Sequence, residues 1–90
     1  MAKEIVWLEH ATQNLIDREI PIVEVQQTIE NPSWREQSYG ERTILMRLYY
    51  DAALDQEMLL RVVVDQSSES FLVITVYKTS KFKRYTGRDK

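Results

Sequence analysis

The sequence predicts an α+β domain in which two N-terminal helices pack on an antiparallel sheet of three to four strands. Two runs rich in Val, Ile and Leu, residues 58–65 and 71–77, flank a polar segment at 66–69, a pattern typical of a β-hairpin. Two segments with helical spacing of apolar residues precede this hairpin. Ninety residues suffice for one core, so we expect residues 1–90 to form a single domain.

The first predicted helix runs from Trp7 to about Arg18, where apolar residues recur at spacings of three and four. Its buried stripe would consist of Trp7, Leu8, Ala11 and Leu15. His10 and Asn14 fall on its polar side, and Arg18 is expected to cap its C-terminus.

Pro21 should end the first helix at the preceding residue and begin a second one, which Asn31 and Pro32 terminate. The buried stripe of the second helix would consist of Ile22, Val25 and Ile29.

The remaining chain predicts a weak edge strand at 34–39, a turn at 40–41, a firm strand at 42–50 and a loop at 51–56 before the hairpin. Alternation predicts that one face of the sheet packs on the helices. That face would carry Ile44, Met46, Leu48, Tyr50, Met58, Leu60, Val62, Val64, Leu72, Ile74 and Val76. The opposite face mixes polar and apolar residues, which predicts contact with water or a partner. It would carry Thr43, Leu45, Arg47, Tyr49, Leu59, Arg61, Val63, Phe71, Val73, Thr75 and Tyr77.

Composition excludes several classes of site. Cysteine is absent and histidine occurs once, so disulfides, thiolate metal sites and multi-histidine metal sites are not available, and we expect no cofactor. Two glycines leave no phosphate-binding glycine loop. No segment has the length of a membrane span or the pattern of a signal peptide, which predicts a cytoplasmic chain without a membrane partner.

The formal charge of −2 is unevenly distributed. From residue 78 onward six basic residues stand against Asp89 alone, whereas the preceding part holds six basic and thirteen acidic residues. A basic tail at about 78–90 on an acidic body suggests a polyanion contact at one end, although a solvated terminus is the commoner cause of such a tail.

Several short motifs resemble the family of small prokaryotic proteins catalogued as domain of unknown function 4258. They are His10-Ala11, Arg18-Glu19-Ile20, Asn31-Pro32, residues 60–65 and residues 73–77. The family usually has a glycine after the arginine, where this chain has Glu19. The resemblance extends to the RelE/ParE toxin superfamily, which implies two helices on a curved antiparallel sheet.

This resemblance implies a toxin of a toxin–antitoxin pair that cleaves messenger RNA without a metal, often on the ribosome. Cleavage by the neighbouring 2′-hydroxyl needs proton transfer and charge neutralisation, which basic side chains and a phenol or imidazole can supply. The expected partners are therefore an antitoxin protein and RNA or the ribosome.

Three residues are candidates for catalysis: Arg61, His10 and Tyr77. Arg61 would offer a rigid fork to phosphate, with a structural ion pair as the equal alternative. His10 is the natural acid or base because histidine is the residue type that ordinarily changes charge near neutral pH, and Tyr77 would stack on a base or donate a proton. The candidates for substrate binding are Arg47, Thr75, Lys81, Arg84 and Tyr85.

Two other functions remain open. The same sheet face would also suit a non-catalytic module that binds a protein partner, as ParE-like inhibitors do, and the acidic body is compatible with an inactive family member.

Overall fold

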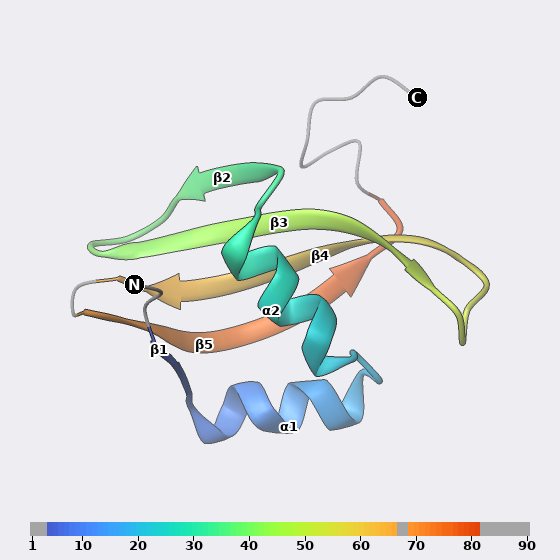
Figure 1. Cartoon of the computed structure of the whole chain (residues 1–90), viewed down its shortest axis with the longest axis horizontal. Helices are drawn as coiled ribbons and strands as arrows, with labels where there is room; N and C mark the ends of the chain where they lie inside the picture. The colour runs from blue at the N-terminus through green and yellow to red at the C-terminus, as the bar shows by residue number, and fades with distance from the viewer. Residues whose placement is uncertain (1–3, 67–68, 82–90) are drawn as a thin grey trace.

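A computed structural model describes residues 4–66 and 69–81 as two helices and a five-stranded sheet (Figure 1). The elements are β1 (Glu4–Trp7), α1 (Glu9–Asp17), α2 (Ile22–Glu30), β2 (Trp34–Gln37), β3 (Arg42–Asp51), β4 (Gln56–Asp65) and β5 (Ser70–Thr79). The strand order is β1-β5-β4-β3-β2. α2 packs across β3 and β4, and α1 packs against β5. The α+β class and the two N-terminal helices are thus confirmed.

The sheet is mixed, and the expectation of a purely antiparallel sheet was wrong. Residues 4–7 pair in parallel with residues 70–73 of β5, so Trp7 ends a strand instead of beginning a helix. Apolar spacing alone could not reveal this, because four residues of strand match the start of a helical stripe as well as an alternating pattern. The parallel pairing leaves β5 without a neighbour on that side beyond Val73 in the described chain.

The face of β4 that contacts the helices agrees with the prediction. Met58, Leu60, Val62 and Val64 all belong to the buried cluster. That cluster also contains Ala11, Ile20, Val25, Ile29, Leu45, Tyr49, Val73 and Val76. Each apolar side chain removed from water in this way contributes about 1.5–3 kcal/mol before chain entropy is considered.

The predicted orientation of β3 was wrong. Leu45 pairs with Val62 and Tyr49 with Met58, so the odd-numbered residues of β3 face the helices. Met46 pairs with Arg61 on the opposite face. Both faces of this strand carry large apolar residues, so the pattern of β3 by itself is equally compatible with either orientation.

A bulge in β5 explains a second difference. Val76 pairs with Val62 but Val73 pairs with Val64, so the pairing of β4 with β5 shifts by one residue at this point. Both Val73 and Val76 consequently face the core, whereas Leu72 and Ile74, which we expected there, are half-buried outside the cluster. Beyond a bulge, the residues that faced one side of the sheet face the other. The apolar pattern of β5 does not reveal where the bulge lies.

The helices bury polar residues that the apolar stripes did not predict. α1 buries Asn14 beside Ala11, and α2 buries Thr28 beside Val25 and Ile29. Ile22, placed in the stripe by its spacing, is 50% exposed. Neither helix in the described part of the chain is long and apolar enough to cross a membrane.

The turn between the helices is a left-handed C-terminal cap. Ile20 N–H donates to the Leu15 carbonyl and Glu19 N–H to the Ile16 carbonyl, the two hydrogen bonds of a Schellman motif. Glu19 adopts a φ of 52°, in the region that glycine occupies without strain. This chain therefore keeps the turn without the glycine, and Arg18 is the residue that precedes it.

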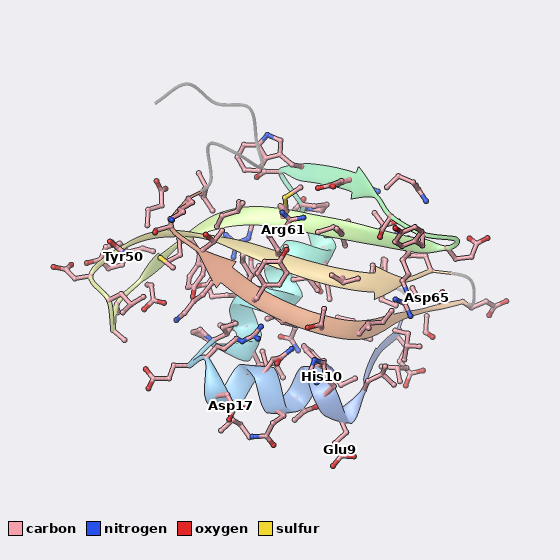
Figure 2. All side chains as sticks on the ribbon, turned by 180° about the vertical axis from the view of Figure 1, so that it is seen from behind. Glu9, His10, Asp17, Tyr50, Arg61 and Asp65 are labelled. Atoms are coloured by element: carbon pink, nitrogen blue, oxygen red, sulfur yellow. The ribbon has the colours of Figure 1, made fainter. Side chains whose placement is uncertain are left out.

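The sheet face opposite the helices is closed at its centre, where we expected an open surface. Met46, Leu59 and Arg61 are 2%, 0% and 3% exposed. One row on this face runs across four strands through Trp34, Met46, Arg61 and Tyr77, and Figure 2 shows Arg61 on the side of the sheet away from α2.

Candidate functional site

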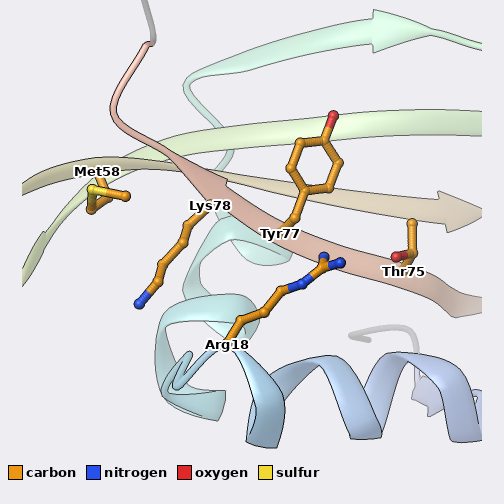
Figure 3. Close-up of a pocket in the computed structure, with 5 residues that line it drawn as sticks. All are labelled: Arg18, Met58, Thr75, Tyr77 and Lys78. Carbon is orange, nitrogen blue, oxygen red and sulfur yellow. The ribbon is translucent and has the colours of Figure 1, made fainter.

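A solvent-open pocket of about 670 Å³ lies at the end of β5 that β1 does not reach. Its lining consists of Arg18, Met58, Thr75, Tyr77 and Lys78. Figure 3 shows Thr75, Tyr77 and Lys78 along β5, with Arg18 reaching toward the strand from the end of α1. The pocket therefore wraps around a strand edge and takes residues from both faces of the sheet.

Arg18 is placed by the cap of α1. Its Nη1 donates to the carbonyl of Val76 at 2.9 Å, at the part of the β5 edge that β1 does not cover. The side chain is otherwise exposed, and its remaining N–H groups have no partner in the described chain. The contact fixes the guanidinium against the strand while leaving donors for a ligand.

Lys78 forms an ion pair with a buried carboxylate, that of Asp51. Its Nζ donates to Asp51 Oδ2 at 2.6 Å and to the carbonyl of Glu19 at 3.3 Å. Asp51 also accepts from the Tyr49 hydroxyl at 3.0 Å and from the Leu54 N–H at 3.1 Å. The ion pair with Lys78 holds the pKa of Asp51 below its usual value despite desolvation, so this carboxylate stays charged.

Burial has the opposite effect on the phenol in this cluster. Desolvation, and then the hydrogen bond to Asp51, raise the pKa of Tyr49 well above that of a free tyrosine. Tyr49 therefore remains a neutral donor to Asp51. The cluster is a structural anchor for Lys78, because both Tyr49 and Asp51 are about 95% buried or more.

Thr75 is oriented by α1. Its Oγ1 accepts from Asn14 Nδ2 at 2.7 Å, a contact between residues 61 positions apart. Thr75 pairs with Val63, next along β5 from the Arg61–Tyr77 pair, and it lines the pocket.

Tyr77 lies over Arg61. The guanidinium carbon of Arg61 is 5.4 Å from the centroid of the Tyr77 ring, which is a cation–π distance. Arg61 Nη2 also forms an ion pair with Glu36 Oε1 at 3.2 Å, so its side chain extends over β3 to the edge strand β2. The structure thus places Arg61 behind Tyr77, where it supports the ring and does not line the pocket.

The arrangement has the chemistry of an anion site with an aromatic neighbour. Arg18 and Lys78 supply positive charge, Thr75 supplies a hydroxyl, and the phenol of Tyr77 supplies a polar tip and a ring face. Met58 forms an apolar wall. A phosphate attached to a planar base fits these groups, whereas a free cation does not. Among the described residues no group of three His, Asp or Glu side chains is arranged to hold a metal ion.

The other predicted site residues lie outside this pocket. His10 is exposed on α1 (Figure 2), two turns and roughly 12 Å along the helix axis before Arg18. Arg47 was expected beside Arg61, but it pairs with Leu60 on the helix side and binds Glu24 of α2. This correction follows from the reversed orientation of β3.

The tail candidates are only partly described. Lys81 is exposed, with its backbone N–H bonded to the Thr79 hydroxyl at 3.0 Å, and it does not line the pocket. Arg84 and Tyr85 lie outside the described residues.

Sequence reasoning missed the two cations of the pocket. Arg18 was assigned to the helix cap, and Lys78 was counted only as the first residue of the basic tail. One signal was present, since Lys78 directly follows Tyr77 at the end of an apolar strand. Its partner Asp51 is 27 residues away, so the pairing depends on sheet register.

Comparison with known proteins yields one match. No curated protein and no solved structure shows significant similarity to the chain. The model of the family described as "Domain of unknown function (DUF4258)" matches residues 7–78, which span both helices and nearly the whole of β2–β5. The chain therefore belongs to the DUF4258 family.

Proposed function

We propose that this protein binds single-stranded RNA at the pocket beside β5 and cleaves it without a metal, as a toxin of the RelE/ParE type. One observation carries the proposal: Arg18, Lys78, Thr75 and Tyr77 line a single open pocket. Arg18 and Lys78 would hold a backbone phosphate, and the ring of Tyr77 would stack on the adjoining base.

The cleavage step requires two proton movements. The 2′-oxygen attacks the adjacent phosphorus, the bond from phosphorus to the 5′-oxygen breaks, and a cyclic phosphate forms. Tyr77 would donate a proton to the departing 5′-oxygen, and Arg18 would neutralise the non-bridging oxygens. The described lining holds no imidazole or carboxylate, so we assign the proton of the 2′-hydroxyl to water.

Binding is tested by fluorescence anisotropy with a labelled ten-nucleotide RNA at low salt. Arg18→Ala should weaken binding about tenfold, because it removes a charge-assisted contact to phosphate. Arg35→Ala is the matched control, since Arg35 is exposed on β2 at the far edge of the sheet. Equal affinity of Arg18→Ala and the unsubstituted protein would exclude the pocket as the RNA site.

Cleavage is tested with the same RNA in the presence of a chelator. Tyr77→Phe keeps the ring but loses the phenolic proton, so it should bind normally and cut about 10²-fold more slowly or less. Unchanged cutting by this variant would remove Tyr77 as the acid. If the unsubstituted protein binds the RNA but does not cut it, only the RNA-binding part of the proposal would stand.

A second function is favoured by a different observation. Beyond Val73 the edge of β5 has no neighbouring strand in the described chain, and Arg18 occupies it at Val76. A protein segment, such as an antitoxin strand, could add to such an edge. In that case the protein would neither bind nor cut RNA. A protein partner encoded beside it would co-purify with it.

A further inference from the structure

Among the described residues of α1, Asn14 is the one whose side chain is hydrogen-bonded to a residue of the pocket lining, Thr75. It is 5% exposed, and its Nδ2 lies 2.7 Å from Thr75 Oγ1. A buried amide is costly unless it is hydrogen-bonded, and an apolar residue at this helical position would pack on β5 without that cost. The contact therefore has a role beyond filling space.

The direction of this hydrogen bond determines what Thr75 offers to a ligand. An amide nitrogen only donates, so the Thr75 oxygen accepts from Asn14. A threonine hydroxyl has one proton and two lone pairs, and its proton remains to be donated elsewhere. No other hydrogen bond of the Thr75 side chain occurs in the described chain, and Thr75 lines the pocket.

The side chains beside Thr75 in the pocket are hydrogen-bond donors as well. Arg18 and Lys78 can only donate, and Thr75 keeps its proton to donate, so three side chains of the lining offer donors besides the Tyr77 hydroxyl. Lys78 is neutralised by Asp51 at 2.6 Å, which leaves Arg18 as the cation without a carboxylate partner in the described lining. The surplus charge near the ligand is thus close to one unit.

From these contacts we propose that Asn14 is a positioning residue, which turns Thr75 into a donor and fits the pocket to the singly charged phosphodiester linkage inside an RNA strand. This inference rests on the proposed function and specifies its substrate. A terminal phosphate, which carries nearly two charges at neutral pH, would leave one charge uncompensated in this pocket. The proposed site should therefore prefer phosphates inside an RNA strand, whereas a general phosphate site would bind terminal phosphates as well.

A double-mutant cycle on RNA affinity tests the role of Asn14. In Asn14→Asp the carboxylate accepts the Thr75 proton, so the donor is withdrawn from the pocket with little change in shape. We expect a loss of about tenfold, the low end for a hydrogen bond to a charged group. In a Thr75→Val background the same substitution should cost only the effect of its added charge.

Gln13→Glu measures the effect of adding one negative charge to α1, because Gln13 is exposed and directly precedes Asn14 in the helix. Thr75→Ser retains the hydroxyl and should therefore recover most of the affinity that Thr75→Val loses. Circular dichroism at the assay temperature verifies that each variant is folded. An equal loss from Asn14→Asp in both backgrounds would overturn the positioning role.

The linkage preference is tested by competition. The dinucleotide UpU should displace the labelled RNA better than uridine monophosphate or inorganic phosphate does, and a 5′-phosphate on the ten-mer should change its affinity less than twofold. Stronger competition by the monophosphate would overturn the charge argument. Loss of binding in Arg18→Ala together with a flat Asn14–Thr75 cycle would refute this inference alone, whereas absence of RNA binding by the unsubstituted protein would refute the proposed function.

Discussion

The ammonium of Lys78 on β5 lies 2.6 Å from the carboxylate of Asp51, the last residue of β3, and so joins two strands that are not neighbours in the sheet. Their side chains are 12% and 4% exposed. They meet on the helix side of β4, since Lys78 pairs with Leu60, which belongs to the core cluster. The same lysine lines the pocket, so the stability of this end of the sheet and the charge of the pocket depend on one ion pair.

The first prediction concerns stability at low pH. Because the pKa of Asp51 is lower in the folded chain than its ordinary value of about 4, its charge stabilises the fold fully above that value. This contribution is lost as the pH falls through the folded-state pKa. Urea unfolding between pH 7 and pH 2 should therefore show a weaker acid dependence in Asp51→Asn than in the unsubstituted protein.

Glu57→Gln is the control for this measurement, because Glu57 is an exposed carboxylate on β4. At neutral pH, Lys78→Met should destabilise the fold by about 3 kcal/mol, since it leaves the buried charge of Asp51 without its cation. An acid dependence that Asp51→Asn does not alter would contradict the assigned pair.

The second prediction concerns the turn after α1. Glu19 has a φ of 52°, a conformation that costs a residue with a side chain roughly 1 kcal/mol relative to glycine. Glu19→Gly should therefore raise the free energy of unfolding by about 0.5–1 kcal/mol, measured by urea denaturation. Asp17→Gly, two residues earlier at the end of α1, should instead lower it by roughly 0.3 kcal/mol.

The third prediction tests which face of β3 meets the helices. Leu45 is 1% exposed in the core cluster, whereas Leu48 is half-buried on the other face. Leu45→Ala should cost about 2–5 kcal/mol by leaving a cavity, and Leu48→Ala distinctly less. The reverse order of denaturation midpoints would restore the orientation that alternation predicted. Leu60→Ala belongs with Leu45→Ala, because Leu60 is fully buried in the same cluster.

The fourth prediction concerns the attachment of α2 to the sheet. Arg47 of β3 forms an ion pair with Glu24 in the first turn of α2, with side chains 22% and 29% exposed. Partial exposure limits such a pair, so Arg47→Met should cost about 1 kcal/mol in thermal or urea unfolding. Arg35→Met on the exposed edge strand should cost less. In a Glu24→Gln background the penalty for Arg47→Met should shrink, and a penalty of equal size would show that the pair is not the cause.

The candidate site was partly predictable. Tyr77 and Thr75 were predicted from the polar interruptions of an apolar strand, and both line the pocket. For Arg61 the sequence left a phosphate ligand and a structural ion pair equally open, and the residue lies 3% exposed behind Tyr77 with Glu36 as an ion-pair partner. A strand pattern indicates only that a side chain alternates. Whether it meets solvent or an acid on another strand depends on what lies across the sheet.

What the sequence by itself determined is local: the two helices, the break at Pro21, the hairpin and the buried face of β4, because each follows from short-range periodicity and backbone preference. The tertiary structure alone decided the parallel pairing of β1, the orientation of β3 and the bulge in β5. It also decided that Arg18 and Lys78 meet beside one strand edge. These features depend on register between segments far apart in the chain, and register is selected by cross-strand packing that no single segment encodes.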